Sequence, residues 1–373
     1  MKDVLLIGFG AVGAIYSLIL ERSREVRVTV VARSNYEIVK DQGMTFHSKK
    51  YGEVEGWRPY RLCRSVHEAA DRHYSYVLIT TKAVPEIQRT PDLISPLLRA
   101  PYIDLYELPT YVVMQNGLGV ERDLYKAVQG IGKDEPTVIG TAVWIGTNLV
   151  TPNEVEHTFF DRVSMGIYRD GDMKLTENSP KETAILEEFK GVLSAGGSEV
   201  TIVPQIQWTK YAKNFWNVAF ASISTLTGYT LPAFFRPPPT EETGPYAPYV
   251  DPTTADKISV YTLPNIEAIM AELVQLGHAM GIPETEEGLP PTNASNVFKF
   301  TRQLHMRPDS VHIPSMMLDA QKGQPLEVEV IIGEVVQLAR EYKVDIPRIE
   351  MLYSLLVVVQ NQILRKRAVS AGA

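Results

Sequence analysis

The sequence lacks the features of disulfide-rich, secreted and membrane-spanning proteins. Its 373 residues include one cysteine, Cys63, so no disulfide can form within the chain, which is typical of a reducing compartment. No apolar run reaches the ~20 residues that a membrane-spanning helix needs. The first residues lead directly into an apolar segment and lack the small-residue cleavage site of a secretion signal. These absences favour a cytoplasmic protein that does not associate with membranes.

The sequence also lacks an excess of basic residues. The net charge is −7, which argues against nucleic acid as a partner. The basic run at 365–367 is short and is interpreted as a solvated helix end. A chain of this length, with 45% hydrophobic residues, can bury a large core and is expected to form two domains. The expected partner is therefore a small-molecule substrate.

The pattern of apolar residues changes near Pro204. The first ~200 residues alternate strand-like and helix-like segments, which is typical of a doubly wound α/β sheet. Later residues show helical periodicity, interrupted by a stretch rich in proline and acidic residues from Phe235 to Pro252 that is expected to be an exposed loop. Strands are predicted at 4–7, 26–31, 77–81, 111–114, 138–146 and 199–203. Helices are predicted at 11–21, 206–224, 264–280, 294–306, 327–342 and 349–365.

A glycine-rich turn follows the first predicted strand. Gly8-Phe9-Gly10-Ala11-Val12-Gly13 matches G-x-G-x-x-G and opens a predicted helix. The three glycines permit the tight turn, the approach of backbone to a pyrophosphate and close helix–strand packing. We therefore predict a Rossmann dinucleotide-binding domain over 1–203 and an all-α domain over 204–373. A glycine-rich packing turn without a ligand is the alternative.

The end of the second predicted strand indicates which dinucleotide binds. An NAD enzyme usually has Asp or Glu there, to bind the ribose 2′-hydroxyl. This sequence has Arg33 and Ser34, with Asn35 next, and these can bind a 2′-phosphate that a carboxylate would repel. The predicted cofactor is therefore NADP, as NADPH in a reductase, and no metal is predicted. The alternative is that Arg33 is an ordinary surface residue.

Two later strand ends carry polar side chains. Lys82 follows one predicted strand and Asn116 follows the next. Ligands of open α/β sheets bind at the carboxyl ends of the strands, so both residues are expected to contact cofactor or substrate. Asn116 precedes a glycine, and a simple turn is the alternative role.

The helix predicted from Ile206 carries polar residues on one face. At about 100° per residue, Lys210, Asn214 and Asn217 share that face. Aromatic neighbours are expected to desolvate the lysine partly, which would make it a better proton donor near neutral pH. A solvated polar stripe is the alternative interpretation.

A further segment has a purely structural interpretation on its own pattern. Ser315 is expected to be a helix N-cap, with Asp319 in the first turn of that helix. Glu327 opens another helical run, where an acidic residue is ordinary.

Taken in order, these residues resemble the ketopantoate reductase (2-dehydropantoate 2-reductase) family. The resemblance comprises the glycine turn, the Thr81-Lys82 strand end, Gln115-Asn116-Gly117, and Lys210 and Asn214 at K-x-x-x-N spacing. It continues with Pro314-Ser315-Met316, Asp319 and Glu327.

The resemblance implies a role for each matching residue. Lys210 would be the general acid that protonates the reduced carbonyl oxygen, and Asn116 would position nicotinamide and substrate. Asn214 and Ser315 would hydrogen-bond the substrate, and Asn217 would replace a second family amide. Glu327 would lie near Lys210 and the hydroxyls of substrate or ribose. Such enzymes reduce a 2-oxo acid with NADPH, here most simply ketopantoate to pantoate for pantothenate synthesis.

The sequence departs from the family pattern at three places. The family's second asparagine, four residues after the first, is Val218 here. An insertion at Phe235–Thr254 follows the catalytic helix, and Asn153 replaces a usual hairpin glycine. One alternative function is therefore reduction of a different ketone or 2-oxo acid, and another is a non-catalytic NADP-binding sensor. The apolar helices 327–342 and 349–365 are expected to complete the core, with a homodimer interface as the alternative.

Overall fold

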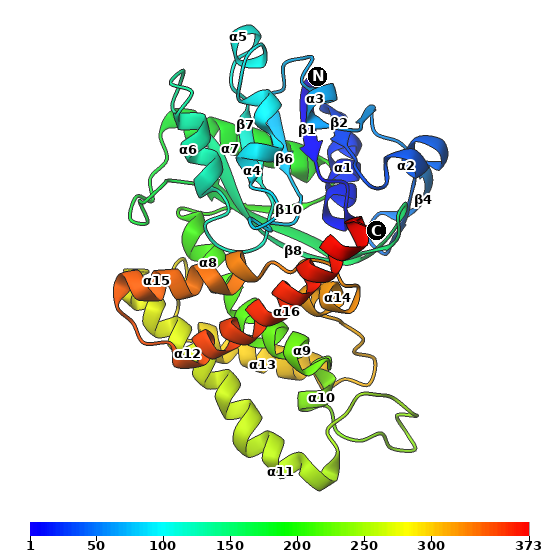
Figure 1. Ribbon diagram of the computed structural model, residues 1–373, viewed down its shortest axis with the longest axis vertical. Coiled ribbons are helices and arrows are strands. Elements are labelled where there is room, and N and C mark those ends of the chain that lie inside the picture. The colour runs from blue at the N-terminus through cyan, green and yellow to red at the C-terminus, as the bar shows by residue number, and fades with distance from the viewer. Residues whose placement is uncertain (373) are drawn as a thin grey trace. The chain divides into compact units, whose positions relative to one another are not determined.

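The computed structural model describes residues 1–372, and the chain divides into two compact units (Figure 1). The first ends at Lys210 and the second begins at Tyr211.

The N-terminal unit contains a ten-stranded sheet. The strand order is β4-β3-β9-β8-β7-β6-β1-β2-β5, and β10 pairs with β9. The strands are β1 (Lys2–Ile7), β2 (Val26–Val31), β3 (Met44–Ser48), β4 (Gly52–Trp57), β5 (Arg61–Cys63), β6 (Tyr76–Ile79), β7 (Thr110–Val113), β8 (Val138–Thr151), β9 (Glu154–Ile167) and β10 (Glu199–Ile202).

Six of these strands, from β5 to β8 in the sheet order, run parallel to one another, and β9 pairs antiparallel with β8. The register pairs Ile7 with both Val31 and Ile79, and pairs Ile79 with Val113. Strands β1, β2, β6 and β7 therefore end at one edge of the sheet. The chain leaves β1 toward β2 on one side and later returns to β6 on the other, and ligands of such sheets bind at this kind of switch point.

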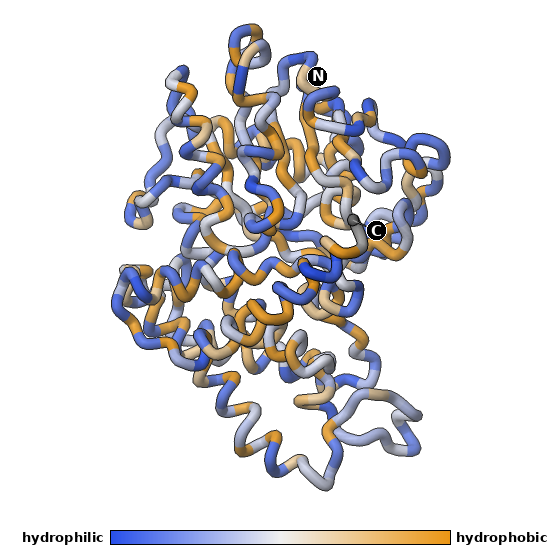
Figure 2. Tube along the Cα trace, in the orientation of Figure 1, coloured by the Kyte–Doolittle hydropathy of each residue, from blue (hydrophilic) through white to orange (hydrophobic). Residues whose placement is uncertain are grey.

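The central strands form because short runs of branched apolar residues can be buried on both faces of a parallel sheet. Val4, Leu6, Val28 and Val30 are fully buried in the core. The hydrophobic colouring in Figure 2 follows these strands. Helix α1 (Ala11–Ser23) contributes Ile15 and other buried residues to the same core.

Helix α7 (Pro180–Ala195) begins with a capping box between Ser179 and Glu182 and packs against α1. The remaining helices of this unit are short. They are α2 (Tyr36–Gln42), α3 (Val66–Ala69), α4 (Thr90–Leu93), η1 (Ser95–Leu97), α5 (Tyr102–Leu105) and α6 (Arg122–Gln129).

The C-terminal unit is helical, and its described residues form no strand. The elements from the shared helix onward are α8 (Ile206–Trp216), η2 (Asn217–Ala221), α9 (Ser222–Thr227), α10 (Pro232–Phe235), η3 (Pro252–Thr254), α11 (Ala255–Lys257), η4 (Ile258–Thr262), α12 (Leu263–Ala279), α13 (Asn293–His305), α14 (Ser315–Gln321), η5 (Glu329–Gly333), α15 (Glu334–Tyr342) and α16 (Pro347–Gly372). The predicted fold class, a Rossmann-type α/β unit followed by an all-α unit, is confirmed.

The proline-rich stretch, expected to be a loop from Phe235 to Pro252, contains neither helix nor strand from Arg236 to Asp251, whereas Phe235 ends α10 and Pro252 begins η3. It is held by the fully buried Arg236, whose Nε donates to the Pro248 carbonyl at 3.0 Å and whose Nη1 donates to the Pro308 carbonyl at 2.8 Å. The guanidinium also lies over the ring of Tyr246, 4.7 Å from its centroid. The loop is therefore mostly exposed but anchored at its base.

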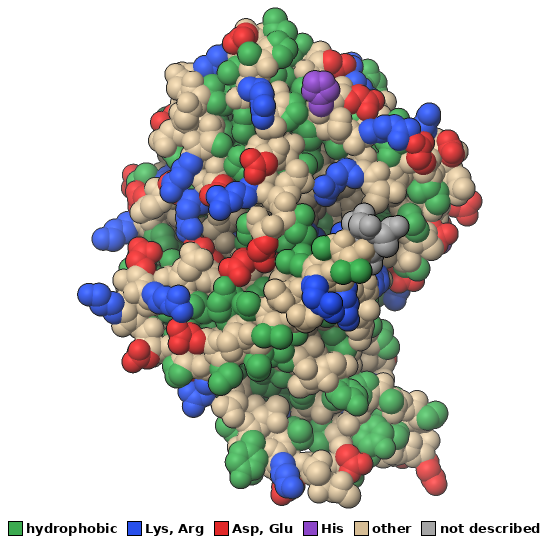
Figure 3. All heavy atoms as spheres, in the orientation of Figure 1, with side chains coloured by type: hydrophobic (Ala, Val, Ile, Leu, Met, Phe, Trp, Pro, Cys, Tyr) green, Lys and Arg blue, Asp and Glu red, His purple; other side chains and the backbone are tan. Residues whose placement is uncertain are grey.

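Across residues 1–372, no helix is both long and apolar enough to cross a membrane. On the face drawn in Figure 3, basic and acidic side chains are interspersed over the N-terminal unit.

Candidate dinucleotide and catalytic site

The glycine turn connects β1 to α1 at the switch point of the sheet. Gly8 has a φ of +108°, and a Cβ there would lie 2.7 Å from the Thr81 backbone nitrogen. A Cβ on Gly13 would overlap the Gly8 carbonyl oxygen and lie 2.7 Å from Thr80 Oγ1. A Cβ on Gly10 would meet nothing within 4 Å. Gly8 and Gly13 are thus required for packing, whereas Gly10 leaves open space at the N-terminus of α1, where a pyrophosphate would fit.

The other residues of the turn divide between core and surface. The Phe9 side chain is buried, with its ring 6.3 Å from that of Trp57, so only its backbone is available to a cofactor. Ala11 and Val12 are half-buried at the start of α1.

Arg33 is an exposed cation directly after β2, at the position predicted to bind the 2′-phosphate of NADPH. Arg33 and Ser34 are exposed, and Arg33 Nη1 donates to Gln88 Oε1 at 3.2 Å. Asn35 differs from the expectation, because its amide donates to the carbonyls of Phe9 (2.9 Å) and Pro152 (3.2 Å). Asn35 therefore holds the loop itself, and its donors are not available to a phosphate.

The ends of β6 and β7 are joined by a side chain. Gln115 Nε2 donates to the Thr81 carbonyl at 2.9 Å and to Thr81 Oγ1 at 3.2 Å. The next residue, Asn116, is half-buried, and Lys82 is exposed after β6. Both thus lie at the edge of the sheet that carries the glycine turn, as the strand register requires.

Lys210 is buried in the N-terminal unit, where its ammonium forms an ion pair with Glu121. Lys210 is 6% exposed and Glu121 is 2% exposed. Glu121 lies five residues after Asn116 in the same connection. The predicted general acid is therefore tied to the loop that carries a predicted nicotinamide-positioning residue.

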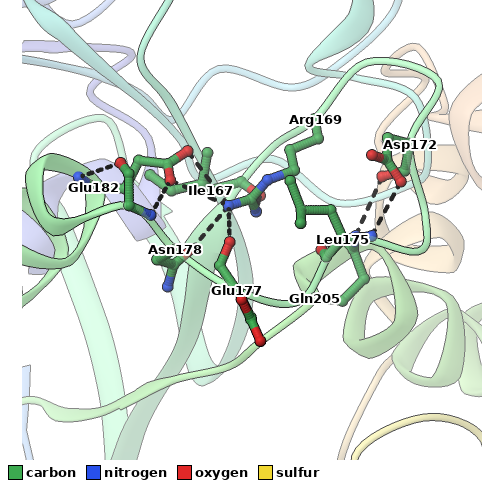
Figure 4. Close-up of polar contacts among 9 residues, drawn as sticks. Ile167, Arg169, Asp172, Leu175, Glu177, Asn178, Glu182 and Gln205 are labelled. Carbon is green, nitrogen blue, oxygen red and sulfur yellow. Dashed lines mark hydrogen bonds and ion pairs between the residues drawn. The ribbon is translucent and has the colours of Figure 1, made fainter.

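The start of α8, which carries Lys210, is fastened to the N-terminal unit by a polar network (Figure 4). Gln205 Nε2 donates to the carbonyls of Asp172 and Leu175, each at 3.2 Å. Arg169, in the same loop, donates from Nη2 to the Glu177 carbonyl at 3.0 Å and also contacts Asn178 and Glu182. The Gln205 contacts hold the residue directly before α8, and the Arg169 contacts join this loop to the start of α7.

Asn214 lies one turn after Lys210 on α8 and is 3% exposed. Its Nδ2 donates to the Ile331 carbonyl of η5 at 2.8 Å, which orients the amide. Its Oδ1 is buried and accepts no hydrogen bond from the described residues. An unpartnered buried acceptor of this kind is suited to a ligand that donates.

The helix changes geometry directly after Trp216. Residues Asn217–Ala221 form a π-helical turn, where Asn217 is half-buried and Val218 is fully buried. Such a turn inserts one extra residue into the helical register, so angles calculated from an ideal helix do not carry past it. The ideal spacing of about 100° per residue therefore applies to Lys210 and Asn214, but it does not fix the direction of Asn217, which begins the π-helical turn.

The expectation that Ser315 is an N-cap is wrong. Pro314 occupies the N-cap position, and Ser315 is the exposed first residue of α14. The Ser315 hydroxyl makes no capping bond. Asp319 and Glu327 are both buried in the C-terminal unit. Since Lys210 and Glu327 belong to different units, the placement of Glu327 beside Lys210 stays a prediction.

Sequence reasoning missed Glu121. The one signal for it in the sequence is its position as an acid in the turn after Asn116-Gly117, just before α6. That signal does not indicate a partner 89 residues away in the chain. Only the structure shows that Glu121 lies against Gly140 of β8, where a Cβ would be 3.1 Å from Glu121 Oε1.

Two other kinds of site find no support among residues 1–372. No group of three or more His, Cys, Asp or Glu side chains is placed to hold a metal ion. Cys63 is fully buried, and burial raises the pKa of its thiol, which is the reverse of the shift that activates a cysteine.

Two family models match this chain. The family model of ketopantoate reductase PanE/ApbA matches residues 4–170, and that of the ketopantoate reductase PanE/ApbA C terminal matches residues 252–360. An uncharacterized protein of Saccharomyces cerevisiae is 26% identical over 380 residues, covering 98% of this chain and 96% of that protein.

Solved structures are similar over almost the whole chain. The 2-dehydropantoate 2-reductase from Methylococcus capsulatus has a TM-score of 0.71 and 25% identity, covering 97% of each chain. A D-mandelate dehydrogenase, in a ternary structure with NADH and anilino(oxo)acetate, has a TM-score of 0.70 and 16% identity, covering 97% of this chain and 99% of that one. At that identity the second likeness concerns the fold alone.

Proposed function

We propose a substrate and a set of residue roles from one premise: this chain belongs to the ketopantoate reductase family. It is therefore an oxidoreductase that uses NAD(P)H. Its proposed reaction is the reduction of 2-dehydropantoate to pantoate, a step of pantothenate synthesis, with NADPH as reductant. The observation that carries this proposal is the buried Lys210 ammonium, tied to the Asn116 loop at the dinucleotide-binding edge of the sheet.

The N-terminal unit has the residues to hold the cofactor. The open space at Gly10 and the N-terminus of α1 suit the pyrophosphate, and Arg33 with Ser34 suits the 2′-phosphate. We assign further cofactor contacts to Gly8, Gly13 and Lys82, to Asn116 and Glu327, and to the backbone of Phe9, Ala11 and Val12. When bound, NADPH supplies the hydride that reduces the ketone carbon. We assign cofactor binding to the predicted domain at 1–203 and substrate binding to the predicted domain at 204–373.

Lys210 is proposed as the general acid. As hydride reaches the carbonyl carbon, negative charge develops on the oxygen, and a nearby ammonium stabilises that charge and then transfers a proton to it. Burial supports this role, because charge–charge interactions are stronger where water is excluded. Glu327 is proposed to act with Lys210 and the substrate.

The substrate contacts are assigned to Asn116, Asn214, Asn217 and Ser315. Asn214 is the most specific of these, since its unpartnered Oδ1 requires a hydrogen-bond donor. The 4-hydroxyl group of ketopantoate is such a donor. The assignment of Ser315 is supported by its exposed position at the start of α14.

A second candidate function is the reduction of a 2-oxo acid with an aromatic side chain. The family's second amide is replaced by the buried Val218, and beside it Trp216 makes an edge contact with His312, with ring centroids 5.6 Å apart. Aromatic rings favour an aromatic ligand over the branched polar chain of ketopantoate. Phenylglyoxylate, a 2-oxo acid with an aromatic side chain, is the probe for this candidate.

The two candidates are separated by NADPH oxidation assays with ketopantoate, phenylglyoxylate and a panel of other 2-oxo acids. We expect the highest kcat/KM with ketopantoate, and a roughly 10²- to 10⁴-fold fall in kcat in Lys210→Ala, the range typical of a general acid. NADPH binding should be nearly unchanged in that variant. A preference for phenylglyoxylate would support the second candidate. Tight NADPH binding without turnover of any compound would instead indicate a sensor, and near-normal turnover by Lys210→Ala would reject the general-acid assignment.

A further inference from the structure

We propose that Glu121 is a positioning residue, whose carboxylate keeps the Lys210 ammonium charged and fixes its direction. This inference rests on the proposed role of Lys210 as the general acid. The ion pair lies entirely within the N-terminal unit, with both side chains almost completely buried.

The surroundings of Glu121 direct its carboxylate toward Lys210. Glu121 precedes α6 at the N-cap position, yet its side chain makes no capping bond. Its carboxylate instead lies over Gly140 of β8, where any side chain would crowd it. Ile206, at the start of α8, packs on the same glycine. The carboxylate thus occupies a space that the absence of a side chain at Gly140 leaves open.

Both ends of the pair are held by other contacts. The Glu121 carbonyl accepts from the Tyr125 backbone N–H at 2.9 Å, which fixes the start of α6. On the other side, Gln207 Nε2 donates to the carbonyls of Arg169 (3.2 Å) and Asp172 (3.1 Å), one turn before Lys210 on α8. A lysine has a flexible four-carbon chain, so a fixed partner is needed to hold its ammonium in one place.

The charge of the pair gives Glu121 a role beyond packing. A buried ammonium without a counter-charge loses its proton readily, and a neutral amine can neither stabilise a developing oxyanion nor donate a proton to it. Tyr168 lies near Glu121 and Arg122 and interacts with both electrostatically. Burial raises the pKa of Tyr168, whose hydroxyl donates to Asp170, so this phenol stays neutral in the working range. Glu121 is the carboxylate that forms the ion pair with Lys210.

A buried ion pair is a costly way to stabilise a fold, because desolvation offsets most of its attraction. The pair instead places a charged ammonium beside the segment that begins at Asn116. This arrangement is suited to a catalytic lysine that must be charged before substrate arrives.

The test compares Glu121→Gln, which removes the charge with little change in shape, with Glu121→Asp, which keeps it. The matched control is Glu107→Gln at an exposed position. With the best 2-oxo acid of the panel, we expect Glu121→Gln to lower kcat about 10- to 100-fold, part of the 10²- to 10⁴-fold effect of a general acid. The alkaline limb of its pH–rate profile should move to lower pH, because the ammonium would lose its counter-charge. Glu121→Asp should restore the limb at least partly, and KM for NADPH should stay within twofold.

A double-mutant cycle tests whether Glu121 influences the rate through Lys210. If Glu121 acts through Lys210, Glu121→Gln has no further effect on the residual rate of Lys210→Ala. Equal losses in both backgrounds would overturn the proposal, and so would an unchanged pH profile in a folded Glu121→Gln. Normal turnover by Lys210→Ala would reject the proposed function instead.

A second measurement does not require turnover. Competitive acetylation with acetic anhydride, quantified by mass spectrometry across pH, reports where the Lys210 amine becomes neutral. We expect half-maximal labelling of Lys210 at lower pH in Glu121→Gln than in the wild type and in Glu107→Gln. Unchanged labelling would overturn the proposal even if no substrate is found.

Discussion

Single side chains at the edge of the sheet carry much of the proposed chemistry. Arg33 is the clearest case, since it is exposed after β2 where an NAD-binding enzyme would have an acidic residue. Its contact in this region is with the neutral Gln88, so its charge is not balanced there by an acid. This environment supports a preference for NADPH over NADH.

Replacing Arg33 tests that preference directly. A charge-assisted hydrogen bond contributes about 1.5–3 kcal/mol, so Arg33→Ala should raise the Kd for NADPH roughly 10- to 100-fold. The Kd for NADH should change by less than about threefold, since NADH has no 2′-phosphate. Fluorescence titration with both cofactors measures this, with Arg99→Ala as an exposed control. An equal rise in Kd for both cofactors would show that Arg33 does not bind the 2′-phosphate.

The end of β6 is closely packed against the glycine turn that precedes α1. Thr80 Oγ1 donates to the Gly8 carbonyl at 2.6 Å and to the Ile7 carbonyl at 3.1 Å, which joins the end of β6 to the turn. Gly13 lies against this junction, whereas Gly10 faces open space. Glycines of one motif therefore serve two different purposes, packing at Gly13 and cofactor access at Gly10.

A pair of alanine substitutions separates these purposes. In Gly13→Ala the new Cβ overlaps the Gly8 carbonyl, so we expect α1 to shift and stability to fall by about 1–3 kcal/mol or more. In Gly10→Ala the fold should be nearly unchanged, but NADPH binding should weaken at least tenfold because the Cβ occupies the space of the pyrophosphate. Thermal unfolding and NADPH titration of both variants measure the two effects. A stable Gly13→Ala would show that the turn can relax.

The second unit contains a buried histidine whose protonation should oppose folding at acid pH. His305 is 1% exposed, and its Nδ1 hydrogen-bonds to Ser310 Oγ at 2.8 Å. Burial, with smaller contributions from His312 and Arg236, lowers the pKa of His305 to about 4. The unfolded chain has the ordinary histidine pKa of about 6.5, so between these values it binds a proton that the folded chain does not.

Stability should therefore be complete above about pH 6.5 and fall as the pH drops toward 4. The loss is on the order of 3 kcal/mol for a shift of this size. Urea unfolding at several pH values measures it, and the slope should be smaller in His305→Gln but unchanged in the exposed control His67→Gln. An identical slope in His305→Gln would assign the acid sensitivity to other groups.

Features that depend on a few consecutive residues could be predicted from the sequence. The strands Val4–Ile7 and Val26–Val31 follow from runs of branched apolar residues, and the glycine turn follows from steric needs within six residues. The alignment of Arg33, Lys82 and Asn116 at one edge was also predictable, because parallel strands must end together. The helical character of the second half followed from its periodicity.

Features that join distant segments were decided by the tertiary structure alone. The pairing of Glu121 with Lys210 depends on how α8 packs against β8, and no local sequence pattern predicts that contact. The same is true of the carbonyl that orients Asn214 and of the π-helical turn at Asn217, where packing overrides the ideal helical angle. Short-range sterics and burial act between chain neighbours, whereas a charge pair between residues 121 and 210 exists only once the sheet and helix have come together.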